Sequence, residues 1–369
     1  MGIALIRGSE EGVELEPGSY RAIDADAHII EGEELFAAYL PEAVRSRAPG
    51  LQPNPRGARR FFFNGVEHPP FPDEISIRKP MPAGNRIKVL DKEKIWAALI
   101  FPSGALSVQY ACDPELARIV TSAYTDWITD YTREYKTRLF FAAPLTLHDV
   151  EWAVSEAQRA VRKGARAIVV RPNPCAGRTW DDPAYDVLYA TVQDLGVPLV
   201  FHETTGDPNT AAAERYGIRN SARYAFHHII SHSFEQMFAA MSVICGGVLE
   251  KHPRLRVMFA EAGCGWVPYW LARLDAHHEH RVLGRQMPIT MKPSEYFRRQ
   301  CYVTCESDDE TLPHVIESVG AERIVFSTDY PHFDSTGGAV DAFEEIRIGD
   351  TERRQILWDN ASQLFGIRQ

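Results

Sequence analysis

Residues 165–202 read ARAIVVRPNPCAGRTWDDPAYDVLYATVQDLGVPLVFH and contain a strand, a helix and a second strand in succession. The ends of this stretch, Ala165–Arg171 and Pro198–His202, are short apolar runs typical of strands that are buried on both faces of a parallel sheet. Between them, Asp182-Pro183 begins an amphipathic helix that Gly196 ends. Two parallel strands joined in this way form a βαβ unit, and its crossover is right-handed in nearly all proteins.

The same alternation of strand and helix recurs along the chain. Eight segments are predicted to be strands: Tyr20–Ala27, Ile95–Phe101, Leu139–Ala143, Ala165–Arg171, Pro198–His202, Leu255–Glu261, Gln300–Cys305 and Arg323–Thr328. Asp113-Pro114 and Asp149 begin two of the helices between them. Eight such units favour a closed (β/α)₈ TIM barrel over an open sheet, so we expect residues 1–369 to form a single domain.

Two long insertions interrupt the alternation of strands and helices. Residues 32–92, which are rich in proline, follow the first strand, and residues 203–233 follow the fifth. The carboxyl ends of barrel strands carry the active site, so both insertions are expected on the active-site face.

Composition excludes several classes of protein. The chain has 40 Lys and Arg against 50 Asp and Glu, a net charge of −10, and no basic stripe, so nucleic acid is not expected as a partner. No apolar run approaches the ~20 residues of a membrane span, so no membrane partner is expected. The six cysteines include no CxxC pair, which argues against a zinc finger. The N-terminus lacks a secretion signal, and we therefore expect a cytoplasmic protein.

The first strand ends in an Asp-x-His motif. Asp26 and His28 are two residues apart, so strand geometry points both side chains to one face, here the barrel interior. A carboxylate and an imidazole that meet there can hold a divalent metal ion, although a buried hydrogen-bonded pair explains the motif alone equally well. His202 at the end of the fifth strand and Asp329 after the eighth lie where barrel enzymes place catalytic groups.

Longer motifs surround these residues. They are D-x-H-x-x-E at Asp26–Glu31, GGVLEKHPRLRV at Gly246–Val257, EAGCGWVP at Glu261–Pro268, STDYPH at Ser327–His332 and ILWDNA at Ile356–Ala361. In these motifs the chain resembles the amidohydrolase superfamily, in the branch that includes aminocarboxymuconate-semialdehyde decarboxylase and the resorcylate decarboxylases. The resemblance extends from about residue 20 to the end of the chain. It implies that one catalytic metal ion is bound by Asp26, His28, His202 and Asp329.

The residue types suggest a role for each group near the metal. Imidazoles and carboxylates together suit zinc, and manganese is the alternative if oxygen ligands dominate. Asp329 has a second oxygen that can transfer a proton. Glu31 is expected to orient a ligand or to contact the substrate.

One position departs from the branch pattern. The decarboxylases resemble one another in a histidine at the end of the sixth strand, where this chain has Glu261. An anion there repels a substrate carboxylate unless it is protonated or paired, so Glu261 favours hydrolysis, as a general acid or base. The alternative is a structural carboxylate that caps the next helix. His232, in a cluster of loop histidines at 227–232, is expected to replace the missing histidine, unless it is a solvated residue or a helix cap.

Further residues are candidates for substrate binding. Arg171 at the end of the fourth strand is expected to bind a substrate anion, with a structural ion pair as the alternative. His228, His332 and Glu31 complete the predicted substrate contacts. Glu203, the residue after His202, is expected to point to the barrel exterior.

These observations leave several functions open. The first is a metal-dependent hydrolase in which metal-activated water attacks an amide, lactone or cyclic carbonyl compound. The alternatives are a non-oxidative decarboxylase of an aromatic or unsaturated carboxylic acid, hydration of a carbon–carbon double bond, and a catalytically inactive binding barrel. The presence of all four ligand-type residues disfavours an inactive barrel. A small-molecule substrate is expected in each catalytic case, and the resemblance implies a homodimer.

Overall fold

The computed structural model describes residues 21–47, 50–63, 66–67, 72, 75–204, 224–333, 335 and 337–368. The expectations about the first twenty residues, and about the part of the second insertion at 205–223, lie outside this range.

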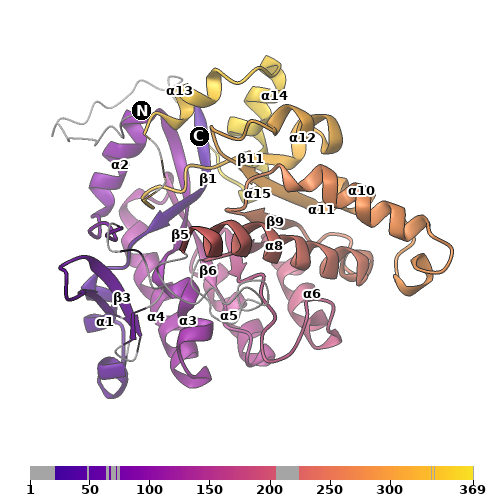
Figure 1. Ribbon diagram of the computed structural model, residues 1–369. Helices are drawn as coiled ribbons and strands as arrows, with labels where there is room; N and C mark the ends of the chain where they lie inside the picture. The colour runs from indigo at the N-terminus through magenta and orange to yellow at the C-terminus, as the bar shows by residue number, and fades with distance from the viewer. Residues whose placement is uncertain are drawn as a thin grey trace.

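Eight parallel strands form the centre of the molecule, each paired with the next one along the chain (Figure 1). They are β1 (Ala22–Ile29), β5 (Ile95–Pro102), β6 (Leu139–Pro144), β7 (Ala167–Val170), β8 (Leu199–His202), β9 (Val257–Ala260), β10 (Cys301–Cys305) and β11 (Ile324–Phe326). Each overlaps one of the segments predicted from apolar runs. This order confirms the prediction of a (β/α)₈ barrel.

Local sequence signals explain where the first barrel helices begin and end. Asp113 caps α4 (Pro114–Thr132), where its side chain accepts a hydrogen bond from the backbone N–H of Leu116. Asp149 caps α5 (Val150–Arg162) in the same way, and Gly196, with a φ of 71°, ends α6 (Asp186–Leu195). The later helices that surround the strands are α8 (Tyr224–Cys245), α10 (Trp266–Glu279), α11 (Pro293–Gln300), α12 (Leu312–Val319) and α15 (Asn360–Phe365). Within the described ranges, no helix is long and apolar enough to cross a membrane.

Strand alternation separates two apolar cores. Ala97 and Leu99 of β5 belong to a small cluster inside the barrel, which Leu364 of α15 joins. Ile168 and Val170 of β7 belong to the larger cluster between the strands and the helices. Because the strands are buried on both faces, they read as continuous apolar runs in the sequence.

Hydrogen bonds join β1 to the segment that directly follows β11, the last strand of the barrel. The backbone N–H of Asp329 donates to the carbonyl of Asp26 at 3.0 Å, and that of His28 donates to the carbonyl of Tyr330 at 2.8 Å. The buried Asp24 carboxylate accepts from both the backbone N–H and the hydroxyl of Thr328. These bonds close the barrel beside Asp26, His28 and Asp329.

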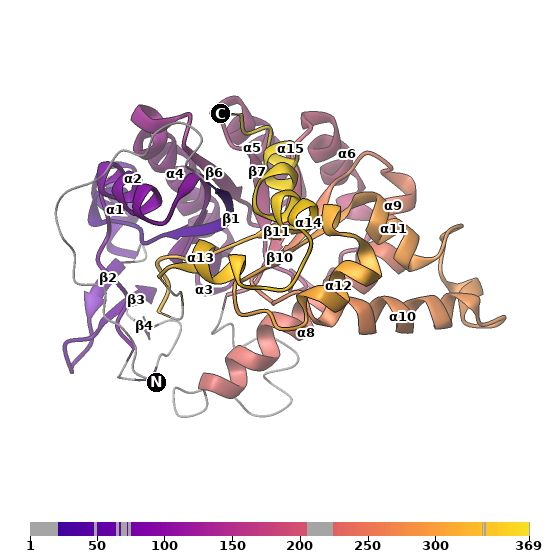
Figure 2. The ribbon, with the colours of Figure 1, turned by 90° about the horizontal axis from the view of Figure 1, so that it is seen from above.

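The first insertion packs against this closure. It contains α1 (Glu33–Ala38), the antiparallel strands β2 (Gly50–Pro53), β3 (Arg59–Phe63) and β4 (Val66–Glu67), and α2 (Ala83–Lys92). Arg86 of α2 is buried and donates hydrogen bonds to the carbonyls of His28 and Tyr330. In Figure 2 the small sheet and the start of α8 lie on the same side of the barrel.

Candidate metal centre

Three side chains from β1 and β8 converge in the barrel. The Nε2 atoms of His28 and His202 are 3.0 Å apart. Oδ1 of Asp26 lies 3.2 Å from Nε2 of His202 and 3.5 Å from Nε2 of His28. All three side chains are buried. The Asp-x-His motif therefore places both of its side chains beside His202.

The hydrogen bonds of the two imidazoles fix where their protons lie. Nδ1 of His28 contacts the carbonyl of Pro102 at 3.0 Å, and Nδ1 of His202 contacts the carbonyl of Glu203 at 2.7 Å. A carbonyl only accepts, so each Nδ1 carries the proton and each Nε2 presents a lone pair to the other. Oδ2 of Asp26 is buried and makes no hydrogen bond to a described residue. These electron-rich atoms repel one another unless a cation lies among them, so the residues fit a divalent metal ion.

The charge states of these groups agree with that role. Burial raises the pKa of Asp26, but the two neighbouring imidazoles outweigh burial and lower it to about 2. Burial lowers the pKa of His28. A charged carboxylate and a neutral imidazole are the forms that bind metals.

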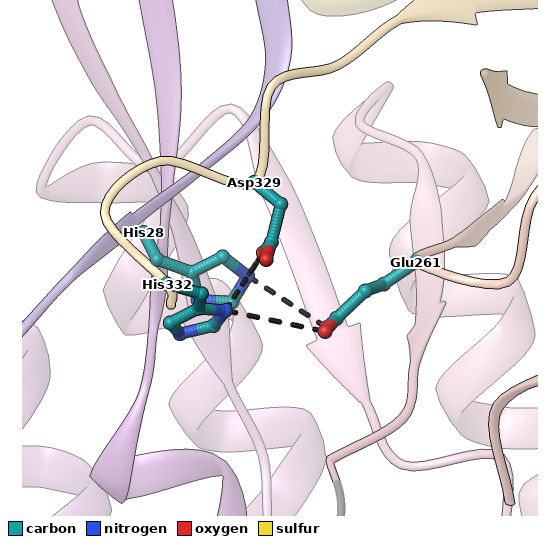
Figure 3. Close-up of side chains that lie close together, drawn as sticks. All are labelled: His28, Glu261, Asp329 and His332. Atoms are coloured by element: carbon teal, nitrogen blue, oxygen red, sulfur yellow. Dashed lines mark ion pairs between the residues drawn. The ribbon is translucent and has the colours of Figure 1, made fainter. Parts of the chain in front are cut away.

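Asp329 approaches the same centre from the loop after β11. Its Oδ1 lies 3.4 Å from Nε2 of His28 and 2.7 Å from Nδ1 of His332 (Figure 3). His332 also hydrogen bonds through Nε2 to Oγ of Ser103, at 3.0 Å. Asp329 has a φ of 52°, in the left-handed region that non-glycine residues rarely occupy and that recurs at functional sites.

Glu261 faces these residues from the end of β9 (Figure 3). Its Oε2 lies 3.3 Å from Nε2 of His202, and its Oε1 lies 3.3 Å from Nε2 of His232. It too has a φ of 52°, and its backbone N–H donates to Oγ1 of Thr304. The next helix, α10, has Gly265 at its N-cap. Glu261 thus lies among the candidate ligands and not at a helix cap.

The structure corrects the placement of the histidine cluster. His228 and His232 were expected in a loop, but α8 begins at Tyr224, so they lie one helical turn apart on one helix. Their ring centroids are 4.3 Å apart. His232 is buried, and burial lowers its pKa well below the usual value. Phe234–Val243 is predicted to be helical from its sequence, but polar residues on the buried face hide the first turns of α8 from a search for apolar periodicity.

Arg171 takes part in a structural ion pair, the alternative given for it, and its partner Glu203 lies elsewhere than expected. They form an ion pair at 2.6 Å, with side chains only 2% and 0% exposed. Glu203 therefore faces the pocket and not the barrel exterior; it follows β8, which ends at His202, so strand alternation no longer sets its direction. The Arg171 charge is balanced by this buried partner, and the guanidinium also donates to Oδ1 of Asn173.

Glu31 supports a loop beside the candidate site. Its carboxylate is fully buried and accepts hydrogen bonds from the backbone N–H groups of Ser103, Gly104 and Ala105. Glu31 therefore positions Ser103, which in turn hydrogen bonds to His332. Sequence spacing does not reveal this role, because the partners lie far away along the chain.

A pocket opens over the centre. His28, Glu261, His332 and His228 contribute polar atoms to it. Its apolar walls come from both insertions and the barrel loops: Ile30, Phe61, Ile77, Leu106, Tyr224 and Phe333. Arg78 also lines the pocket and stands 5.3 Å from the ring centroid of Tyr330. No sequence pattern indicates Arg78 or Ser103, and the only signal for Asp24 is its alternation with Asp26.

Comparisons with known proteins agree with this architecture. Residues 23–367 match a family model described as amidohydrolase. A gamma-resorcylate decarboxylase from Polaromonas sp. JS666 is 27% identical over 292 residues, which cover 77% of this chain and 87% of that protein. A 2-amino-3-carboxymuconate-6-semialdehyde decarboxylase from Dictyostelium discoideum is 22% identical, over 70% of this chain and 69% of that protein.

Solved structures show the same fold. An amidohydrolase from Mycobacterium avium subsp. paratuberculosis has a TM-score of 0.79 at 22% identity, over 95% of this chain and 98% of that one. A dihydroxybenzoic acid decarboxylase from Polaromonas sp. JS666, solved with manganese and 2-nitroresorcinol, has a TM-score of 0.73 at 23% identity, with the same coverage of both chains.

Proposed function

This chain belongs to the amidohydrolase family, and on that basis we propose that it is a metal-dependent decarboxylase of an aromatic carboxylic acid. The observation that carries the proposal is the similarity to gamma-resorcylate decarboxylase, which extends over 77% of the chain. Decarboxylation, rather than the hydrolysis placed first in the sequence analysis, is therefore the reaction we favour.

We propose that Asp26, His28, His202 and Asp329 hold one divalent ion. When bound, such an ion polarises substrate oxygens and stabilises the negative charge that develops on them. The two imidazoles suit zinc. The carboxylates, and the manganese in the solved decarboxylase, make manganese the alternative.

Asp329 is the proposed proton donor. During the reaction the bond between the ring carbon and the carboxylate carbon breaks, its electron pair stays on the ring carbon, and CO₂ leaves. A proton from the Asp329 carboxyl group then forms the new C–H bond. His332, 2.7 Å from Asp329 and hydrogen bonded to Ser103, connects that carboxyl group to the pocket wall.

The pocket walls support a flat, apolar substrate. Phe61, Leu106 and Phe333 provide apolar surface above the polar centre. Such surface excludes water and can stack against an aromatic ring.

Hydrolysis is the second candidate, because of Glu261. This carboxylate lies beside both His202 and His232, where it can serve as a general base toward water. Repulsion between Glu261 and a substrate carboxylate is the physical argument against decarboxylation.

One experiment separates these candidates. The purified protein is loaded with zinc or manganese and incubated with hydroxybenzoic acids, and in parallel with aromatic lactones and amides. We expect CO₂ release from the acids, and we expect deuterium from D₂O to enter the phenol product at the ring carbon. The Asp329→Asn variant should lose about 100-fold in rate, while the surface variant His314→Ala should not change.

The outcomes are distinct. Turnover of lactones or amides without CO₂ release would establish the hydrolase. No turnover by metal-loaded protein across both panels would favour a binding barrel.

We also propose a cytoplasmic homodimer. The exposed apolar side chains of α8, which include Ile229, Phe234 and Phe238, support an interface on that helix.

A further inference from the structure

Two histidines of helix α8 lie close to the carboxylate of Glu261. His228 and His232 are separated by one turn, and a ring nitrogen of each lies within 4.8 Å of a carboxylate oxygen of Glu261. Two histidines four residues apart on one helix face form the ligand pair of many zinc sites. These three residues are distinct from the four assigned to the first ion.

The hydrogen bonds of His232 determine which of its ring nitrogens carries the proton. Nδ1 lies 3.0 Å from the carbonyl of His228, which only accepts, so Nδ1 carries the proton. Oγ of Ser231 lies 3.3 Å from the same nitrogen and can accept as well. Nε2 therefore presents a lone pair, and it makes no hydrogen bond to any residue that the structure describes.

That lone pair faces a carboxylate oxygen. Nε2 of His232 is 3.3 Å from Oε1 of Glu261, and the two side chains are only 6% and 13% exposed. Two electron-rich atoms at this distance, largely shielded from water, repel each other unless a cation lies between them. His28 and His202 show the same signature in the first centre.

Glu261 faces both sets of residues. Its Oε2 is turned toward His202 at 3.3 Å and His28 at 4.0 Å. Its Oε1 is turned toward His232 at 3.3 Å and His332 at 4.0 Å. In two-metal sites, one group commonly bridges ions about 3.5–4 Å apart.

We propose that His228, His232 and Glu261 form a second metal site and that the Glu261 carboxylate bridges it to the first. Two imidazoles and one carboxylate suit a borderline cation such as zinc or cobalt. The second site does not depend on which reaction the protein catalyses.

Metal stoichiometry tests the proposal. Metal-free protein is loaded with zinc, excess metal is removed, and bound zinc is measured by plasma mass spectrometry. We expect two equivalents in the wild type and one in the double variant His228→Ala/His232→Ala. The matched control, His277→Ala/His280→Ala, removes two histidines near the exposed end of α10 and should keep two equivalents.

A direct observation keeps the test independent of how the variants fold. Anomalous diffraction at the zinc edge from crystals of the wild type should show two peaks, one on each side of Glu261. A single peak with one equivalent of zinc in the wild type would overturn the second site, and so would two equivalents in the double variant. Neither readout uses catalysis, so a failed activity assay and a failed second site are distinguishable.

Discussion

Replacing Arg86 with leucine tests how the first insertion supports the metal centre. Arg86 is only 1% exposed. Its Nη1 donates to the carbonyl of Tyr330 at 3.1 Å, and its Nη2 donates to the carbonyl of His28. Its guanidinium also stands 4.9 Å from the ring centroid of Tyr330. One side chain of α2 therefore holds the backbone of both strand ends that carry candidate ligands.

The expected cost follows from these contacts. Each lost charge-assisted hydrogen bond to a buried carbonyl costs about 1.5–3 kcal/mol. Leucine no longer buries a charge, which offsets part of that loss. We therefore expect the free energy of unfolding to fall by about 3 kcal/mol. An unfolding entropy of ~2.1 cal/mol/K per residue, over 369 residues, converts this to a fall of about 4 °C in Tm.

The Arg86→Leu substitution should also weaken metal binding. The freed carbonyls belong to His28 and to the residue after Asp329, so both ligands lose a backbone support. Loss of such support typically lowers metal affinity by about 10–100-fold. Calorimetry of the metal-free protein measures the fall in Tm, and competition with a chelating dye measures the loss of metal affinity.

Arg138→Leu is the matched control. Arg138 also donates to two strand carbonyls, those of Trp96 and Ile95, and stands 5.2 Å from a Trp96 ring centroid. Arg138 directly precedes β6, and both carbonyls lie at the start of β5, at the opposite end of the strands from the candidate ligands. Arg138 also pairs with Asp91 at 2.6 Å, so its loss costs at least as much stability. If the two variants lose similar stability and bind metal equally well, Arg86 does not position the ligands.

Four further outcomes are expected. His202→Ala should lower bound metal by one equivalent, whereas His314→Ala should not. Thr328→Val leaves the buried Asp24 without its hydroxyl donor and should cost about 1–3 kcal/mol in urea unfolding; an unchanged midpoint would contradict this. All six cysteines are buried, and burial raises the pKa of Cys112 and Cys245 to about 12. Ellman's reagent should therefore label no thiol in folded protein and six after denaturation. Phe238→Asp should lower the mass measured by light scattering from dimer to monomer, and a wild-type monomer would refute the dimer.

The barrel could be predicted because its determinants are local. Strands buried on both faces read as apolar runs, and Asp113, Asp149 and Gly196 mark helix ends through their own backbone contacts. The convergence of Asp26, His28 and His202 followed from strand geometry, since parallel strands bring their carboxyl ends together.

The remaining site residues depend on partners that are distant in sequence. Glu31 accepts hydrogen bonds from backbone N–H groups beyond residue 100, and Arg171 pairs with Glu203, which follows the neighbouring strand β8. Helix α8 buries His227 and His232 on a face where apolar periodicity expects hydrophobic residues. Such contacts are set by tertiary structure, and spacing alone does not encode them.

The seam between β1 and β11 has a consequence for protein synthesis. Asp26 and His28 leave the ribosome long before Asp329, which lies about 300 residues further along the chain. The bonds from Asp329 and Tyr330 that close the barrel form only after Asp329 has emerged. A nascent chain that has not yet reached Asp329 therefore lacks one of the four proposed metal ligands, and it also lacks the bonds that join the last strand of the barrel to the first.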